Sequence, residues 1–405
     1  MHDSRSKPQG SAIRAITFLA VASFAAQAMV RATDSLLPQI ASGLHVTVGE
    51  ASIIVTVYLL AHGSVQLIIG PIGDRFGKYL CVTIAAAVAT VFVAACGLAP
   101  NLHVLIATRL GSGLANGWII PFALAFVGDV IPYERRQQVI GTFLSGQILG
   151  QMFGQAASGV LGDLFGWRNV FFVLAGLLAI GTLGLLHELI RNPITRASPT
   201  GGAQALGFVA GNKAVLRSPW ARMMMAMAFI ESAAMFGAFT YVGADLHLRF
   251  DVGFALVGLF VGFFAVGGLI YSLSVRSLIS RLGQPGLTMG GGFMLAAAYV
   301  VLAFEPVYWT APLAITVAGL GFYMLHNTLQ TNATQMTPEA RGTALGLFSA
   351  ALYLGQTAGV AVGGVMFDRF TAVTVFLTAA ALLLALGLWF GTALARRARE
   401  AAQAI

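Results

Sequence analysis

Long apolar runs, separated by short segments that carry charge, constrain this chain more than any other feature. Runs such as 82–96 and 373–394 are continuous and lack the alternation of polar and apolar residues that a barrel strand requires. Only 9% of the 405 residues are charged, against about 25% in soluble domains, so there is too little charge to cover a water-facing surface. Because backbone groups in hydrocarbon must pair within the chain, the sequence predicts an all-α polytopic membrane protein.

Twelve runs are long enough to cross a bilayer, since one transmembrane helix needs roughly 20 residues. The predicted spans are 14–37, 50–70, 79–98, 102–126, 138–162, 168–188, 219–244, 252–275, 285–304, 308–333, 342–366 and 371–394. The only long polar stretch, 189–218, divides them into two six-helix bundles, 14–188 and 219–395. Residues 1–13 and 396–405 are then a cytoplasmic N-terminus and a cytoplasmic tail.

The distribution of basic residues predicts the orientation. With the N-terminus inside, eighteen of the 23 Lys and Arg residues fall in inside segments and three in outside segments, while Arg31 and Arg109 lie within spans. The positive-inside rule therefore places both termini in the cytoplasm, as expected for a bacterial inner membrane. We read the basic N-terminus as an uncleaved first span rather than a signal peptide. The formal net charge of +8 belongs to these loops and does not indicate nucleic-acid binding.

The two halves repeat each other at an offset of 205 residues. The identities in register include Gly150 with Gly355, Gln151 with Gln356, Gly154 with Gly359, Gly159 with Gly364 and Asp163 with Asp368. So many glycines in register indicate an internal duplication, and the two bundles are expected to be pseudo-symmetric. Parallel six-span repeats are a transporter architecture, with the substrate site between the repeats near the middle of the membrane.

A glycine-rich loop between the second and third spans carries the most specific motif. Its residues are Gly70, Gly73, Asp74, Arg75, Gly77 and Lys78. This spacing resembles the signature loop of the major facilitator superfamily, and the resemblance extends over essentially the whole chain. It implies the major facilitator fold, with a cavity lined chiefly by spans 1, 4, 7 and 10. In that family the loop is a conformational latch; a plain turn bearing positive-inside charges is the alternative.

The fifth span carries the glycines Gly141, Gly150, Gly154 and Gly159. Small residues four apart let helices approach closely, which would suit a contact between the halves. The pattern resembles the motif of drug/proton antiporters, but Gln155 and Ser158 replace a proline and a glycine, which weakens the assignment to that subclass. Gln147, Gln151 and Gln155 share one face of this helix, and either cavity lining or contact with a partner helix explains them.

Three ionisable residues within spans are candidates for proton coupling: Asp34, Arg109 and Glu231. An intramembrane arginine is costly. Arg109 resembles the family's fourth-span arginine, which is implicated in proton coupling, although a structural ion pair would also explain it. Asp34 is part of a pattern found in some drug/proton antiporters, and it can also simply neutralise Arg31. Glu231, expected near mid-depth without a fixed cation, is either a proton carrier or a neutral hydrogen-bonding group.

The predicted substrate cavity collects the polar residues of the inward-facing helices. They are Gln27, Arg31, His62, Gln66, Asn116, Gln147, Gln151, Glu231, His326, Asn327, Gln330 and Gln356. No nucleophile constellation, nucleotide-binding loop or metal-ligand cluster is visible, and Cys81 and Cys96 share one apolar run without implying a disulfide or a metal site. An enzymatic function is therefore not predicted.

The resulting expectation is a secondary-active transporter that exports a small organic molecule or drug by proton antiport, working as a monomer in the lipid bilayer. It needs no cofactor, because the proton gradient supplies the energy, and its partners are the solute and protons rather than nucleic acid. An uptake permease or facilitator of the same fold, for a sugar, an organic anion or a metabolite, is the first alternative. A membrane sensor built on a transporter scaffold is the second.

Overall fold

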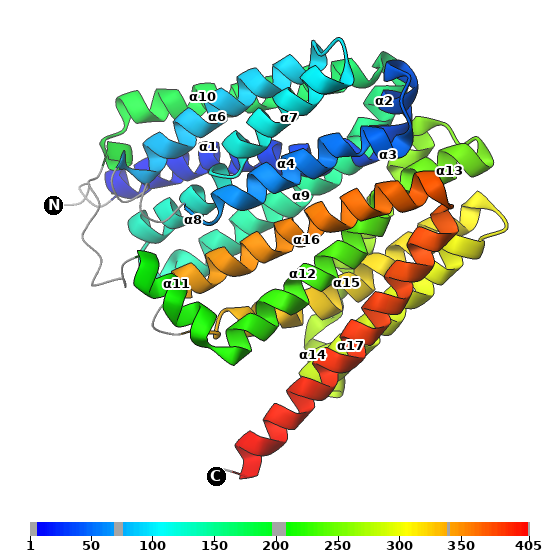
Figure 1. The fold of residues 1–405 in the computed structure, drawn as a ribbon. Helices are drawn as coiled ribbons and strands as arrows, with labels where there is room; N and C mark the ends of the chain where they lie inside the picture. The colour runs from blue at the N-terminus through cyan, green and yellow to red at the C-terminus, as the bar shows by residue number, and fades with distance from the viewer. Residues whose placement is uncertain (1–5, 69–75, 197–207, 338–340, 404–405) are drawn as a thin grey trace.

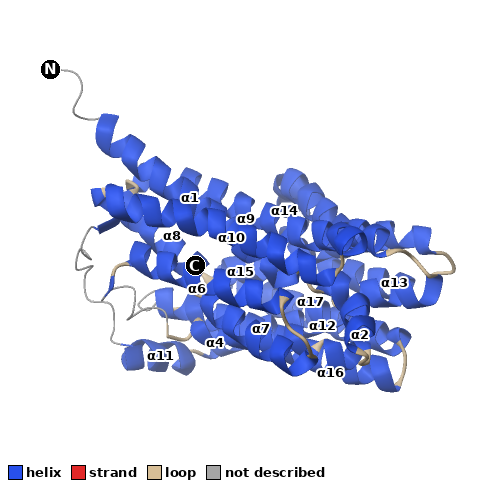
Figure 2. Ribbon diagram, turned by 90° about the horizontal axis from the view of Figure 1, so that it is seen from above, coloured by secondary structure: helices blue, strands red, loops and turns tan. Residues whose placement is uncertain are grey.

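The computed structural model describes residues 6–68, 76–196, 208–337 and 341–403 (Figure 1). Within these ranges every regular element is a helix (Figure 2). The first half comprises α1 (Ser6–Arg31), η1 (Asp34–Leu36), α2 (Leu37–Leu44), α3 (Val48–Ala51), α4 (Ile53–Val65), α6 (Lys78–Gly97), α7 (Leu102–Asn116), α8 (Ile119–Val130), α9 (Tyr133–Phe165) and α10 (Trp167–Arg191). The second half comprises α12 (Pro219–Phe239), α13 (Val242–Phe250), α14 (Phe254–Phe304), η3 (Tyr308–Thr310), α15 (Ala311–Ala333), α16 (Arg341–Arg369) and α17 (Ala372–Gln403).

Ten helical stretches of the described chain are long and apolar enough to cross a membrane. One of them, α14, has 51 residues and is two spans: at Gly283 the backbone leaves the helix with φ 61°, a conformation that favours glycine. The 33-residue α9 is not among the ten, since it carries the glutamine face, but it runs beside α1 through the bundle (Figure 1). The twelve predicted crossings are therefore present.

The helices extend further than the apolar runs from which they were predicted. The first span continues past α1 through η1 and α2, and α9 begins at Tyr133 rather than near 138. The polar linker also contains η2 (Pro193–Arg196) and α11 (Phe208–Arg217), and α11 packs against α12 and α16. Hydropathy does not predict these parts, because a helix that leaves hydrocarbon no longer needs apolar side chains.

The internal repeat is visible in how the helices pack. Four glycines lie so close to the backbone of a neighbouring helix that an added Cβ would clash with a carbonyl oxygen: Gly150 with Phe24, Gly154 with Ala28, Gly355 with Phe229 and Gly359 with Ala233. The first two pairs join α9 to α1, and the last two join α16 to α12. The residue numbers of each pair in the second half exceed those of the matching pair in the first half by 205. The same helix contact therefore occurs once in each half.

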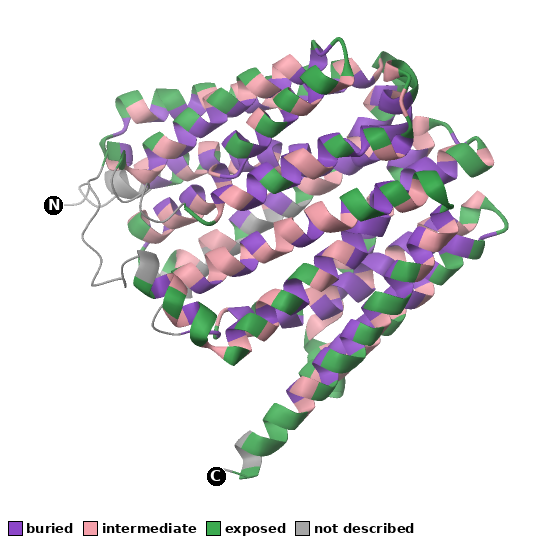
Figure 3. Ribbon diagram, in the orientation of Figure 1, coloured by how far each residue is buried: buried purple, intermediate pink, exposed green. Residues whose placement is uncertain are grey.

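Buried residues line the interior and exposed residues lie on the outside (Figure 3). Many of the exposed residues are large and apolar. Leu273, Leu313 and Val91 are 89%, 70% and 68% exposed. Water would make such a surface unfavourable, whereas the hydrocarbon of a bilayer solvates it. The exterior is therefore that of a membrane protein.

The halves meet at the end of the bundle opposite to the chain termini, which we call the distal end and where α2, α3 and α13 lie (Figure 1). Gly159 of α9 packs against Gly258 of α14; a Cβ at Gly159 would lie 2.5 Å from the Gly258 Cα. On the other side, the Asp368 carboxylate of α16 accepts a hydrogen bond from the Gly49 N–H at 3.0 Å and another from the Thr47 hydroxyl. We call these two contacts the distal seal. They join the two halves at this end of the molecule.

Candidate functional site

Arg31 is the centre of a buried polar contact between the halves. It ends α1, and the 3₁₀ turn η1 brings Asp34 back towards it, with 3.3 Å between Arg31 Nη1 and Asp34 Oδ2. Its Nη2 donates to Gln356 Oε1 of α16 at 2.5 Å, and its guanidinium lies 3.8 Å from the centre of the Phe236 ring of α12. Arg31 and Asp34 are only 1% and 2% exposed. A charge this deeply enclosed needs a partner, and here the first half supplies the carboxylate while the second half supplies an amide and a ring.

Arg109 of α7 is completely buried but forms no salt bridge with any described residue. Its guanidinium lies 4.1 Å from the Tyr58 ring centre, and its Nε donates to the Ile54 carbonyl at 3.3 Å. Its two terminal nitrogens find no hydrogen-bond acceptor in the described chain. The interpretation of Arg109 as half of a fixed ion pair is therefore wrong for this conformation. Its charge is held by a ring face and a carbonyl, and Asp34 is near enough to interact electrostatically.

Glu231 of α12 is paired with His326 of α15, which the sequence analysis considered separately. The distance from Glu231 Oε2 to His326 Nδ1 is 2.8 Å, and the imidazole stacks on Phe322 with ring centres 4.8 Å apart. Glu231 is 0% exposed, whereas the His326 side chain is 18% exposed. Glu231 therefore has a histidine as its partner, and this histidine is a cation only when it is protonated. The second oxygen, Oε1, has no hydrogen-bond partner among the described residues.

His62 of α4 lies at the interface between the halves. It is buried, and its ring centre is 4.4 Å from that of Tyr353 in α16. Gly63 beside it provides the space, since a Cβ there would lie 2.6 Å from the Tyr353 Cβ. Tyr353 was not predicted as a site residue; it stands in an apolar helix with no pattern that distinguishes it from other aromatic residues.

The predicted cavity amides are not joined in one network. Asn116 and Gln147 are buried, Gln27, Gln66 and Gln151 are half-buried, and Asn327 and Gln330 are exposed. Asn327 Nδ2 donates a hydrogen bond to the Tyr271 hydroxyl at 3.2 Å. Gln66 Nε2 donates to the Gly117 carbonyl at 3.2 Å. Gln155 is buried, and its amide nitrogen has no partner in the part of the chain that the structure describes. The glutamine face of α9 thus remains explained equally by cavity lining and helix contact.

Most of the signature loop lies outside the described residues, including Gly70, Gly73, Asp74 and Arg75. Gly77 is described and has φ 88°, which explains the glycine at this position, where it precedes α6. The adjacent Lys78 Nζ forms a salt bridge of 2.6 Å with Asp129 Oδ2 of α8. This ion pair lies within the first half, so it neither supports nor contradicts a latch between the halves.

The glycines of the fifth span have two different neighbours. Gly141 lies in the first turns of α9, and Gly150 and Gly154 pack on α1 of their own half. Of the three glycines whose surroundings are described, Gly150, Gly154 and Gly159, only Gly159 touches the second half. The contact between halves that the motif suggested is thus limited to its distal end.

The described residues contain no group of three His, Cys, Asp or Glu side chains that could hold a metal ion. Cys81 and Cys96 are both free thiols.

The chain is similar in sequence to several bacterial membrane transporters. It is 25% identical to YceJ of Bacillus subtilis, an uncharacterized MFS-type transporter, over 84% of this chain and 87% of the relative. It is 27% identical to the multidrug efflux protein YfmO of the same organism, over 90% and 89% of the two chains. A probable sugar efflux transporter of Pasteurella multocida is 24% identical over 88% and 86%. These relatives are membrane transporters and not enzymes.

Solved structures and a family model agree with this assignment. A peptide transporter crystallised with alafosfalin superimposes with a TM-score of 0.75 at 16% identity, covering 94% of each chain. At 16% identity this similarity establishes the fold and not the transported solute. The model of the Major Facilitator Superfamily matches residues 19–354 of this chain. Because that match covers most of the sequence, the chain belongs to the major facilitator superfamily.

Proposed function

We propose that this transporter is a proton-coupled antiporter that exports a small organic molecule across a bacterial inner membrane by alternating access. We further propose that it acts as a monomer with both termini in the cytoplasm and uses the proton gradient as its only energy source. With this orientation the distal end faces outwards, so the conformation described here is closed to the outside by the distal seal. The efflux function in the names of two relatives supports the direction of transport.

The observation that carries the proposal is the contact between Glu231 and His326. A carboxylate enclosed in the membrane interior is unfavourable when charged, and it becomes less so when an imidazole beside it takes up a proton. His326 is the more exposed member of the pair, at 18% against 0% for Glu231, and in the proposed mechanism it is the group through which protons enter. Oε1 of Glu231 is buried and has no hydrogen-bond partner among the described residues, and in the proposed mechanism a donor group of the solute binds it when the site opens. Solute and proton then compete for one carboxylate, which is the minimal requirement for antiport.

Arg31, Asp34 and Arg109 link this exchange to the conformational change in the proposed mechanism. The contact from Arg31 to Gln356 joins the two halves, and in the proposed mechanism it breaks when the distal end opens. Protonation of Asp34 after outward opening leaves Arg31 without its counter-charge. Closure buries Arg31, and the ionised Asp34 carboxylate then serves as its counter-charge.

The proposal is tested with protein reconstituted into liposomes that contain a pH-sensitive dye. A panel of lipophilic cations, sugars and nucleosides is added under an imposed pH gradient. We expect at least one solute to cause proton movement across the membrane of liposomes that contain the wild-type protein. We expect no solute to do so in liposomes that contain Glu231→Gln. The matched control is Glu188→Gln: Glu188 is also buried, but Asn192 holds it at 2.7 Å in the first half.

Two outcomes contradict antiport. Downhill flux of a solute without any proton movement identifies a facilitator, which is the alternative function. Equal proton release by the wild type and by Glu231→Gln shows that another group carries the proton. If Glu188→Gln loses coupling together with Glu231→Gln, the effect reflects damage to the fold, and the assignment of Glu231 is rejected.

A further inference from the structure

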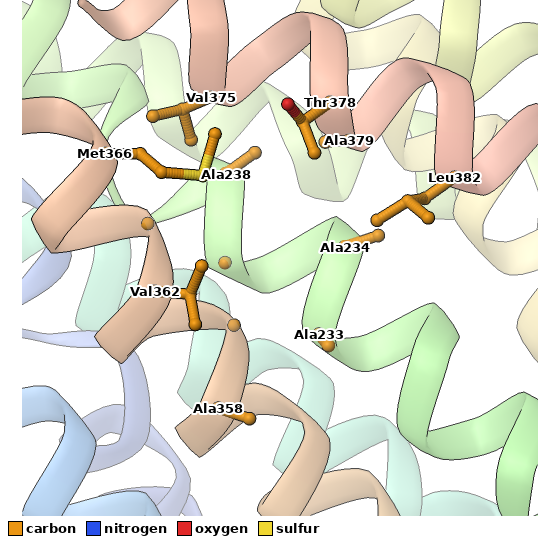
Figure 4. Close-up of a pocket in the computed structure, with 13 residues that line it drawn as sticks. Ala233, Ala234, Ala238, Ala358, Val362, Met366, Val375, Thr378, Ala379 and Leu382 are labelled. Carbon is orange, nitrogen blue, oxygen red and sulfur yellow. The ribbon is translucent and has the colours of Figure 1, made fainter. Parts of the chain in front are cut away.

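A lateral cavity of about 180 Å³ lies in the second half, and none of the residues that line it is ionisable (Figure 4). It is enclosed by α12, α16 and α17. Its walls are apolar except for the hydroxyl of Thr378, and Val362, Met366 and Val375 point into the space between the helices (Figure 4). We call this cavity the lateral groove.

The groove follows from how the three helices pack. Gly237 of α12 and Gly359 of α16 bring these helices together backbone to backbone; a Cβ at Gly237 would lie 2.8 Å from the Gly359 Cα. Because small residues of both helices form the floor, no side chain fills the space above it. The third helix, α17, packs on α12 and α14 and diverges from α16 (Figure 1). A wedge between α16 and α17 is left open.

The environment of the rim indicates what fills the groove. Val362 and Leu382 on the rim are 58% and 45% exposed, at positions in the middle of helices that cross the membrane. Side chains of this kind at this depth contact lipid chains. An apolar space does not hold water, because it offers no hydrogen-bond partners. Hydrocarbon from the bilayer is therefore the matching occupant.

The distal end of the groove carries one free positive charge. Met366 lines the groove, and Arg369 lies one helical turn further along α16, about 4.5 Å towards the membrane surface. Arg369 is exposed and forms no ion pair with any described residue, while its neighbour Asp368 is engaged with the first half. A basic side chain at this level attracts the phosphate of a lipid headgroup.

We propose that the lateral groove is a phospholipid site: one acyl chain lies between α16 and α17, and the lipid phosphate contacts Arg369. The acyl chain of the lipid contacts both α16 and α17, which otherwise diverge, and so stabilises the packing of the second half. The site is independent of the proposed antiport, since it uses none of the residues that contact protons or solute.

Native mass spectrometry of the full-length protein tests the site. The protein is delipidated in detergent and mixed with dioleoyl phosphatidylglycerol or, in a separate arm, with dioleoylglycerol, which has no phosphate. We expect one tightly retained phospholipid in the wild type and none in Thr378→Trp, because the indole fills the groove. Leu388→Trp is the matched control, since Leu388 lies on the same helix, is 48% exposed and does not line the groove.

Arg369→Gln separates the headgroup from the chain. We expect it to bind phosphatidylglycerol roughly two- to fivefold more weakly, as for an exposed ion pair, and to bind dioleoylglycerol as the wild type does. The control is Arg399→Gln, which removes the same charge from the exposed C-terminal part of α17.

Val362→Trp fills the groove from α16 and replaces Thr378→Trp if that variant unfolds. Equal phospholipid retention in groove-filled and Leu388→Trp proteins overturns the site, and equal weakening of both lipids by Arg369→Gln overturns the headgroup contact.

Discussion

The guanidinium of Arg31 lies 3.8 Å from the centre of the Phe236 ring. Phe236 occupies the position in the second repeat that corresponds to Arg31 in the first, 205 residues further on. A residue that touches its counterpart lies beside the pseudo-twofold axis between the halves. Two arginines there would repel each other, whereas a cation over a ring attracts. The duplication has thus become asymmetric at the place where symmetry would be unfavourable.

Asp34→Asn should destabilise the protein strongly, because it leaves the Arg31 charge buried without a carboxylate. Breaking a buried ion pair costs about 3–5 kcal/mol. We expect the double variant Arg31→Gln, Asp34→Asn to recover most of the loss, since no charge is then stranded. Thermal unfolding in detergent measures both. Arg14→Gln is the control: it removes the Arg14–Glu188 pair, in which Arg14 is 68% exposed, and should have little effect. Wild-type stability in Asp34→Asn would refute a static ion pair at this position.

Gly159→Ala should open the distal end. The added methyl group clashes with the backbone of Gly258, which cannot move aside as a flexible side chain would. Spin labels at Leu98 and Leu248, which are 72% and 62% exposed on opposite halves, report the separation of this end. We expect a larger mean distance in Gly159→Ala and no change in Gly146→Ala, because Gly146 of the same helix has open space around its Cβ position. An unchanged distance in Gly159→Ala would show that this contact does not limit opening.

Asp368→Ala should loosen the other side of the distal seal. The Asp368 carboxylate binds the Gly49 N–H and the Thr47 hydroxyl across the interface, and loss of these exposed hydrogen bonds costs about 1 kcal/mol. Labelling of a cysteine at Ser52, which is buried between the halves, should become roughly fivefold faster in a background without Cys81 and Cys96. Glu50→Gln is the control, because Glu50 accepts a hydrogen bond from Thr47 N within the first half only. Equal labelling rates in both variants would exclude a role for the interface contact.

Local sequence patterns predicted the elements that depend on local chemistry. Apolar length defines a helix that crosses hydrocarbon, so the twelve spans follow from the residues alone. Glycine spacing indicated that Gly154 lies at a helix contact, but it suggested a contact between the halves, whereas Gly154 packs on α1 of its own half. The register also paired Asp163 with Asp368, but no role for Asp368 followed from it. Its partners Thr47 and Gly49 lie more than 300 residues away in the chain.

The site was predicted only as a set of candidates, because its contacts depend on which helix faces meet. Glu231 and His326 are 95 residues apart, and Arg31 and Gln356 are 325 residues apart. All four were named from the rarity of polar groups in a membrane, yet nothing in a single helix specifies its partner. The ring of Phe236 carried no signal at all, since 28 phenylalanines occur in the chain.

Glu305 lies between two spans at the distal end, directly after α14. Its Oε1 is 3.1 Å from Arg249 Nη2, its Oε2 accepts from the Thr310 hydroxyl at 3.1 Å, and Arg249 also pairs with Asp245 at 2.8 Å. The side chain is 1% exposed, and burial raises the pKa of Glu305 to about 7 in spite of Arg249 and Thr310. Proton binding at Glu305 is therefore linked to folding of this surface.

A raised carboxyl pKa means that the folded state binds the proton more tightly than the unfolded state does. The stabilisation by Glu305 is then complete below the unfolded pKa, near 4.5, and is lost as the pH rises through about 7. We expect Glu305→Gln to lose this component, on the order of 1–3 kcal/mol, so that its unfolding temperature changes less between pH 5 and pH 8 than that of the wild type. Asp251→Asn removes a charge from the same face and should keep the wild-type pH dependence, because Glu305 remains. If Glu305→Gln and wild type respond to pH alike, another group accounts for the pH dependence.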